Sequence, residues 1–251
     1  MSPSSHPFQL VAHRGNASEF PENTLPAFQS ALDLGLKYLE LDIQLAADGV
    51  PMVIHDSRLE RTAGMSGSVF DMRARMLQEI EVAETARFGE RYRGTHIPRL
   101  TDVLALLEGR PDVRIFVEIK KESLRHFGHD QVVGKVLEAI RPVQQQCVVI
   151  SYDLAAIFRA RQIGGATIGW VLEHYDQHSR LKYEALQPEF LFGDKETLPP
   201  QGALWRGPWQ WVIFEVVTLE LAQALAARGA HHIETMQVRQ MSSGLAALTP
   251  A

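Results

Sequence analysis

The chain has 251 residues, 45% of them hydrophobic, and a formal net charge of −5 at pH 7. This length allows one large core or two smaller ones, and the scattered Lys and Arg residues argue against a nucleic-acid-binding surface. The single cysteine, Cys147, excludes a disulfide within the chain and favours a reducing compartment.

No apolar stretch of the sequence is long enough to span a membrane. The first residues also lack the basic and apolar regions of a secretory signal. We therefore expect a cytoplasmic protein with no membrane span and no nucleic-acid partner. The oligomeric state is left open, since nothing in the composition bears on it.

Strand-type and helix-type patterns alternate along most of the chain. In chain order we expect a strand at residues 8–13, a helix at 24–35, strands at 38–45 and 51–55, a polar irregular stretch at 56–98 and a helix at 100–107. We then expect strands at 113–120, 146–151, 166–172, 189–192, 211–217 and 231–235, with helices at 130–140, 154–163 and 219–228 and a weaker helix before residue 189.

Strand–helix alternation implies parallel strands with helices packed outside them. At this length, a closed (β/α)8 barrel, the TIM-barrel architecture, is the leading prediction. An open doubly wound sheet is the alternative, but it would call for a Gly-rich phosphate loop after the first strand, which this sequence lacks. We interpret residues 56–98 as a small insertion after the second barrel strand, within a single domain of residues 1–251.

The segment YLELDIQL, residues 38–45, carries two carboxylates in a strand-type alternation. Taken alone, it is typical of a strand with one solvated polar face. In a parallel barrel, however, both strand faces are covered. Glu40 and Asp42 would then point into the barrel, where an uncompensated charge is very costly.

A second strand, VRIFVEIK at residues 113–120, repeats the arrangement with Glu118 and Lys120. Both polar pairs stand near the carboxyl ends of their strands, where barrel enzymes place their active sites. Glu40, Asp42 and Glu118 therefore form a candidate site for a divalent cation with oxygen ligands, Mg²⁺ or Ca²⁺, with Mn²⁺ as a further candidate.

Basic residues at other strand ends complete a candidate chemistry. His13 and His55 each follow a predicted strand and could act as general acid and base near neutral pH. Arg14 offers a planar fork of donors for phosphate oxygens, and Lys120 offers a point charge. A cation, cationic clamps and proton-transfer groups are what phosphoryl transfer needs.

The sequence resembles the glycerophosphodiester phosphodiesterase family. The motifs that carry the resemblance are HRG at 13–15, PENT at 21–24, ELD at 40–42, HD at 55–56 and EIK at 118–120. They follow the family's order and approximate spacing through the first half of the chain. The set is specific as a whole, although HRG or HD alone would carry little weight.

The resemblance implies a (β/α)8 barrel with a small insertion after the second strand. It implies a divalent cation held by Glu40, Asp42 and Glu118, an acid–base pair of His13 and His55, phosphate contacts from Arg14 and Lys120, and Glu22 near the cation as a ligand or a supporting group. It implies hydrolysis of a glycerophosphodiester, the small-molecule substrate, to sn-glycerol 3-phosphate and an alcohol. In this family the glycerol 2-hydroxyl is thought able to attack the phosphorus, after which water opens the cyclic product.

The second half departs from the family pattern. Residues 213–217 read IFEVV where a Trp-Thr-Val-Asn-like segment is expected. Residues 234–237 read ETMQ where Thr-Asp-x-Pro is expected. These differences leave the cation and phosphate residues in place and bear on recognition of the glycerol and of the leaving alcohol.

Two other functions fit parts of the sequence. One is a phospholipase D-like lyase that acts on lysophospholipid head groups, although such proteins are typically secreted and disulfide-bonded. The other is a barrel that binds a phosphorylated metabolite without turnover, although binding alone needs no pair of histidines. The metal-dependent phosphodiesterase remains the leading hypothesis.

Overall fold

A closed barrel of parallel strands forms the centre of the computed structural model, which describes residues 7–247. The barrel strands are β1 (Gln9–Ala12), β2 (Tyr38–Leu45), β4 (Arg114–Ile119), β5 (Cys147–Ser151), β6 (Thr167–Val171), β7 (Phe190–Asp194), β8 (Gln210–Phe214) and β9 (His232–Thr235). Because β1 pairs in parallel with both β2 and β9, the sheet closes. The predicted (β/α)8 architecture is confirmed.

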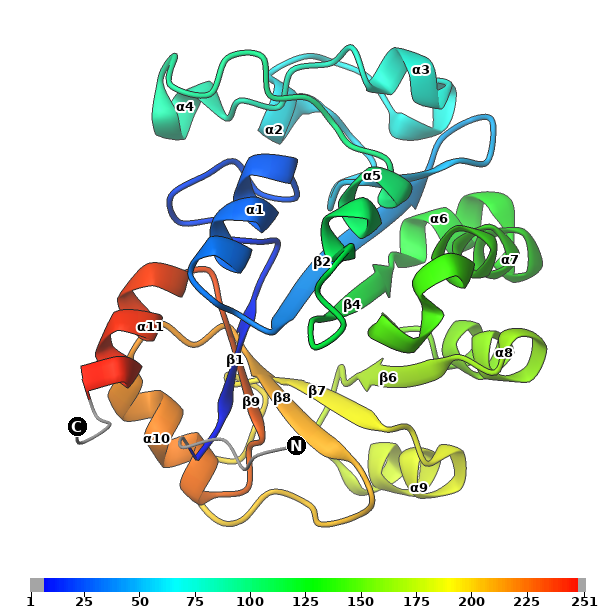
Figure 1. Cartoon of the computed structure of the whole chain (residues 1–251). Helices are drawn as coiled ribbons and strands as arrows, with labels where there is room; N and C mark the ends of the chain where they lie inside the picture. The colour runs from blue at the N-terminus through cyan, green and yellow to red at the C-terminus, as the bar shows by residue number, and fades with distance from the viewer. Residues whose placement is uncertain (1–6, 248–251) are drawn as a thin grey trace.

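Helices surround the barrel, as Figure 1 shows. They are α1 (Leu25–Asp33), α5 (Leu100–Leu104), α6 (Lys121–Phe127), α7 (His129–Ile140), α8 (Leu154–Gly164), α9 (Gln177–Leu186), α10 (Leu219–Ala227) and α11 (Val238–Ala247), with 3-10 turns η2 (Ala105–Leu107) and η3 (Arg141–Gln146). Helices α6 and α11 were not among the predicted elements. Among the described helices, none combines the length and the apolar character that crossing a bilayer requires.

The strand predicted at residues 51–55 does not belong to the parallel set. It is β3 (Pro51–Val53), which pairs antiparallel with the end of β2. The reason is chain length: only residues 46–50 join the two strands, and a parallel crossover needs a dozen or more. The hairpin turns the chain back along β2, so that Ile54 N donates to the carbonyl of Asp42 and His55 arrives beside the barrel rim.

Residues 56–98 carry short helical turns: α2 (Glu60–Ala63), η1 (Val69–Asp71), α3 (Ala74–Leu77) and α4 (Thr85–Phe88). In Figure 1 this segment lies at the top of the view, near α1 and α5. Its Leu59, Leu77 and Ile97 pack in a small apolar cluster with Met52 of β3 and Ile54. Its description as an insertion within a single domain of residues 1–251 stays a prediction.

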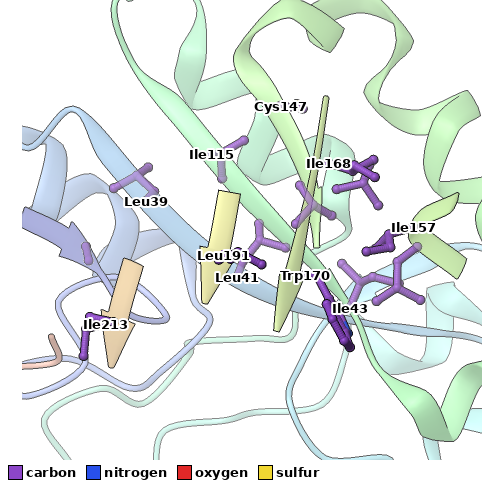
Figure 2. Close-up of a cluster of buried hydrophobic side chains, with 14 of the residues drawn as sticks. Leu39, Leu41, Ile43, Ile115, Cys147, Ile157, Ile168, Trp170, Leu191 and Ile213 are labelled. Carbon is purple, nitrogen blue, oxygen red and sulfur yellow. The ribbon is translucent and has the colours of Figure 1, made fainter. Parts of the chain in front are cut away.

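The barrel strands bury both faces, in line with the strand alternation. Leu39, Leu41 and Ile43 face outward into the core between strands and helices (Figure 2). The inward face packs a separate apolar cluster that includes Val11 and Phe116. Because successive strand residues point to opposite faces, the carboxylates of β2 must point into the barrel.

Leu41 provides a test of this core. It is fully buried, and truncation of a buried Leu typically costs 2–5 kcal/mol, roughly. We expect Leu41→Ala to lower the free energy of unfolding in urea by about that amount. The control is Leu181→Ala, since Leu181 is 57% exposed and its loss should change stability by less than about 0.5 kcal/mol. Equal effects of the two substitutions would contradict the assigned barrel face.

Candidate active site

The polar residues singled out in the sequence meet at the carboxyl ends of the barrel strands. They line a cavity of about 90 Å³ with His13, Arg14, Glu40, His55, Glu118 and Lys120 on its polar side and Ile150, Tyr152, Val171, Phe192 and Phe214 on its apolar side. The register of β2 and β4 places Asp42 opposite Glu118. The cavity floor is the apolar cluster inside the barrel.

The HRG motif forms a tight turn between β1 and α1. Arg14 has a left-handed backbone (φ 56°), which is uncommon for a residue with a side chain. This turn aims the Arg14 amide at Glu40 Oε2, 3.1 Å away. Gly15 follows with φ 79°, and a Cβ there would lie 2.7 Å from the backbone of Ala27. The motif therefore requires glycine at this position.

Glu40, Asp42 and Glu118 come together as predicted. One carboxylate oxygen from each lies within 4.8 Å of the others. Asn23 fixes Asp42 through two hydrogen bonds, donating from Nδ2 to Oδ2 (2.9 Å) and accepting from the Asp42 amide (3.2 Å). Asn23, from the PENT motif, thus orients one member of the carboxylate group.

Two fixed positive charges oppose this group. Arg14 Nε lies 3.1 Å from Asp42 Oδ2. Lys120 Nζ lies 3.2 Å from Asp42 Oδ1 and 3.0 Å from Glu118 Oε1. Burial alone would raise the pKa of Asp42, but Arg14 and Lys120 outweigh burial and hold this pKa well below its usual value.

The other buried carboxyls are not compensated in this way. Burial, followed by repulsion from Asp42, raises the pKa of Glu40 well above its usual value. Burial also raises the pKa of Glu118, although Lys120 opposes the effect. Glu234 is buried as well, and it lies beside His13.

The residues present fit a divalent cation. Glu40 Oε1 is buried and has no hydrogen-bond partner within the described part of the chain. Arg14 and Lys120 offset two of the three carboxylates, so a divalent cation would supply positive charge that this group lacks. Glu40, Asp42 and Glu118 offer only oxygen ligands, which suit Mg²⁺, Ca²⁺ or Mn²⁺. Glu40 also forms a second close group with His13 and Glu234, in which one of the three ligands would be nitrogen.

Each of the two histidines has a carboxylate partner on Nδ1. His55 Nδ1 lies 2.6 Å from Asp56 Oδ1, and His13 Nδ1 lies 2.6 Å from Glu215 Oε2. An ionised carboxylate has no proton to donate, so Nδ1 carries the hydrogen in both rings. Burial opposes protonation of His13, but Glu234 and Glu215 outweigh burial and raise its pKa.

Glu22 lies beside the site but outside both close carboxylate groups. Its carboxylate accepts from Arg14 Nη1 at 3.0 Å and from Arg61 at 2.7 and 2.8 Å. Burial would raise the pKa of Glu22, but the hydrogen bond from Arg61 and the charge of Arg14 lower it. Through the Glu22 carboxylate, Arg61 of α2 connects residues 56–98 to Arg14, whose guanidinium could donate hydrogen bonds to a phosphate.

Glu215 and Glu234 were not among the predicted site residues, although both belong to the segments that depart from the family pattern. Glu234 Oε1 lies 3.6 Å from His13 Nε2, and its Oε2 is buried without a hydrogen-bond partner among residues 7–247. A position near the carboxyl end of a barrel strand selected Glu40 and Glu118, and the same rule would have found Glu234. Glu215 lies in the predicted strand 211–217, but there it alternates with Trp211 and Ile213, which face the outer core, so the strand pattern would not have placed it inside the barrel.

Fold and site together define a (β/α)8-barrel protein with its site at the carboxyl ends of the strands, where barrel enzymes carry their catalytic groups. The sequence model of the glycerophosphoryl diester phosphodiesterase family matches residues 13–187. The chain belongs to this family.

Similarity to individual proteins agrees with this membership. The glycerophosphodiester phosphodiesterase of Caldanaerobacter subterraneus is 37% identical over 144 residues, covering 57% of this chain and 56% of that protein. The Bacillus altitudinis enzyme of the same name is 35% identical over 144 residues, covering 57% and 58%. The matched region spans little more than half the length of each of these curated relatives.

Solved structures show the same fold. A phosphodiesterase from Oleispira antarctica, in complex with the product sn-glycerol-3-phosphate, superimposes with a TM-score of 0.82 at 20% identity, covering 95% of this chain and 96% of that chain. Glycerophosphodiester phosphodiesterase from Thermotoga maritima gives a TM-score of 0.73 at 20% identity, covering 95% and 98%.

The electrostatics of Glu234 lead to a pH-dependent prediction for protein kept in EDTA. Burial raises the pKa of Glu234 from its ordinary value of 4.5 to about 7. The folded protein therefore holds this proton more tightly than the unfolded chain does, and ionisation of Glu234 costs stability as the pH rises from 4.5 to about 7.

Glutamine cannot ionise, so Glu234→Gln should match the wild type near pH 4.5 and exceed it in stability above pH 7. The gain should reach up to about 3 kcal/mol, since one pKa unit corresponds to roughly 1.4 kcal/mol. Urea unfolding at several pH values measures the difference. The exposed Glu220→Gln serves as control. A gain that does not change between pH 4.5 and pH 8 would be inconsistent with a buried, proton-binding Glu234.

Proposed function

We propose that this protein is a divalent-cation-dependent phosphodiesterase that hydrolyses glycerophosphodiesters to sn-glycerol 3-phosphate and an alcohol. The observation that carries the proposal is that two histidines, two cationic side chains able to bind phosphate and a cluster of three carboxylates lie around one cavity. Family membership supports the reaction class, and the Oleispira antarctica phosphodiesterase with bound sn-glycerol-3-phosphate supports the product.

Arg14 and Lys120 are the proposed phosphate-binding residues. Their positive charges are fixed, because the surrounding carboxylates raise the pKa of each above its already high ordinary value despite burial. Arg14 can offer a planar fork to two phosphate oxygens, and Lys120 can contribute a point charge. We propose that Glu22 is a supporting residue that holds Arg14, since its carboxylate is occupied by Arg14 and Arg61.

Glu40, Asp42 and Glu118 are the proposed cation ligands. When bound, the cation would act as a Lewis acid that stabilises negative charge developing on the phosphoryl oxygens. The carboxylates themselves repel the anionic substrate, so they support binding only when their charge is balanced.

His13 and His55 are the proposed acid–base pair. The glycerol 2-hydroxyl attacks the phosphorus and gives its proton to one histidine, while the other histidine donates a proton to the oxygen of the leaving alcohol. One P–O bond forms, one breaks, and the alcohol leaves. Water then attacks the cyclic ester with the two proton transfers reversed, giving sn-glycerol 3-phosphate.

The single buried cysteine, Cys147, supports a cytoplasmic site of action, because cytosolic thiols remain reduced. The preferred alcohol and the physiological cation are open parts of the proposal.

The first test offers purified protein a panel of glycerophosphodiesters and lysophospholipids with Mg²⁺, Ca²⁺ or Mn²⁺. We expect glycerol 3-phosphate to be released from glycerophosphodiesters, to stop with EDTA and to resume when the cation is restored. A cyclic phosphate that accumulates from lysophospholipids would instead identify a lyase. Tight binding of the substrates without any product would identify a binding protein and contradict the proposal.

The second test concerns the histidines. We expect His13→Ala and His55→Ala each to lower kcat by about 10²-fold or more, the usual scale for general acid–base groups. The matched control is His178→Ala, since His178 is exposed on α9, and this change should leave kcat unchanged. Near-normal rates in both site variants would refute the assigned acid–base roles.

A further inference from the structure

Glu215 follows β8 directly, and both oxygens of its carboxylate are engaged. Oε2 lies 2.6 Å from Nδ1 of His13, and Oε1 accepts a hydrogen bond of 2.7 Å from the backbone amide of Met236. The carboxylate thus joins the end of β1 to the segment after β9. Neither oxygen is free to turn toward another partner.

The backbone around Glu215 is held as firmly as its side chain. Its carbonyl accepts from Lys195 Nζ at 2.7 Å, and the amide of Val216 donates to the carbonyl of Glu234 at 3.0 Å. The segment is therefore tied to the end of β7 and to β9. A carboxylate on such a support can set the orientation of a ring that contacts it.

His55 shows the same arrangement by a local route. Its Nδ1 faces Asp56, whose other oxygen accepts from Arg61 Nε at 2.6 Å. The HD motif places this carboxylate next in the sequence. His13 has Ala12 and Arg14 as its neighbours, so its partner comes from 202 positions away.

We propose that Glu215 is a positioning residue for His13: by accepting the Nδ1 hydrogen it fixes the ring tautomer and leaves Nε2 facing the cavity for proton transfer. Nε2 lies 3.9 Å from Glu40 and 3.6 Å from Glu234, on the cavity side of the ring. The inference rests on the proposed function. It assigns a task to a segment in which this chain departs from its family's pattern.

Glu215→Gln is the sharpest variant, because glutamine keeps the shape but offers one acceptor oxygen and one donor group. The Met236 amide requires the acceptor, so the glutamine NH₂ would face His13 Nδ1. The ring would then carry its proton on Nε2, the wrong nitrogen for a base. In the serine-protease triad, the corresponding Asp→Asn change leaves the histidine in the wrong tautomer and lowers kcat by about 10⁴-fold.

The experiment compares wild type, Glu215→Gln, Glu215→Asp and the exposed control Glu220→Gln. Steady-state kinetics give kcat and KM. ¹⁵N NMR of the imidazole nitrogens, recorded at a pH above the pKa of His13 so that the ring is neutral, reads the His13 tautomer. For Glu215→Gln we expect kcat to fall about 10²–10⁴-fold with KM nearly unchanged, and the proton to move from Nδ1 to Nε2. Glu215→Asp should keep the Nδ1 proton and recover part of kcat, while Glu220→Gln should match the wild type.

A double variant separates this inference from the proposed function. If Glu215 acts through His13, adding Glu215→Gln to His13→Ala should cause no further loss of kcat. A multiplicative loss in the double variant, or an unchanged His13 tautomer in Glu215→Gln, would overturn the inference. Absence of phosphodiester turnover in the wild type would overturn the proposed function instead, and the tautomer measurement would still decide the role of Glu215.

Discussion

The structure depends on one electrostatic constraint: the carboxyl groups of Glu40, Asp42 and Glu118 are buried together at the rim of a closed barrel, where two fixed positive charges, Arg14 and Lys120, oppose them. Ionised carboxylates are costly to bury without compensation, so the barrel must supply rigid partners. Asn23 makes two hydrogen bonds to Asp42. The tight turn at Arg14 lets its backbone amide donate to Glu40. The PENT and HRG motifs therefore hold the carboxylate group in place, and they also lie next to the proposed catalytic residues.

The same constraint connects stability with function. Repulsion from Asp42 helps to raise the pKa of Glu40 and of Glu118. A divalent cation would favour the ionised form of all three carboxyl groups, since ionised oxygens bind it best. Phe192 and Phe214 line the apolar side of the cavity, and apolar surroundings strengthen the interactions between these charges, since water screens them less there. A fold optimised for stability alone would place apolar side chains here. The retained charge is consistent with the proposed cation site and with the proposed phosphate-binding residues beside it.

Much of this arrangement could be predicted from sequence, because strand alternation in a covered sheet leaves few choices. The pattern in β2 placed Glu40 and Asp42 inside the barrel, and the pattern in β4 placed Glu118 beside them. The prediction that residues 51–55 belong to the parallel strands was wrong. Strand periodicity does not show whether two strands run parallel or antiparallel, whereas the length of the connection between them does. Glu215 could not be foreseen in the same way. Its contact with His13 spans 202 positions and forms only when the barrel closes.

The presence of a cation site formed by the buried carboxylates is tested most directly by measuring Mn²⁺ binding to the substrate-free protein with calorimetry and electron paramagnetic resonance. We expect one saturable ion per chain in the wild type. The affinity should be at least about 10-fold weaker in Glu118→Gln and unchanged in Glu122→Gln, since the Glu122 side chain is exposed on α6. Absence of saturable binding in the wild type, or equal affinity in the two variants, would contradict the presence of this cation site.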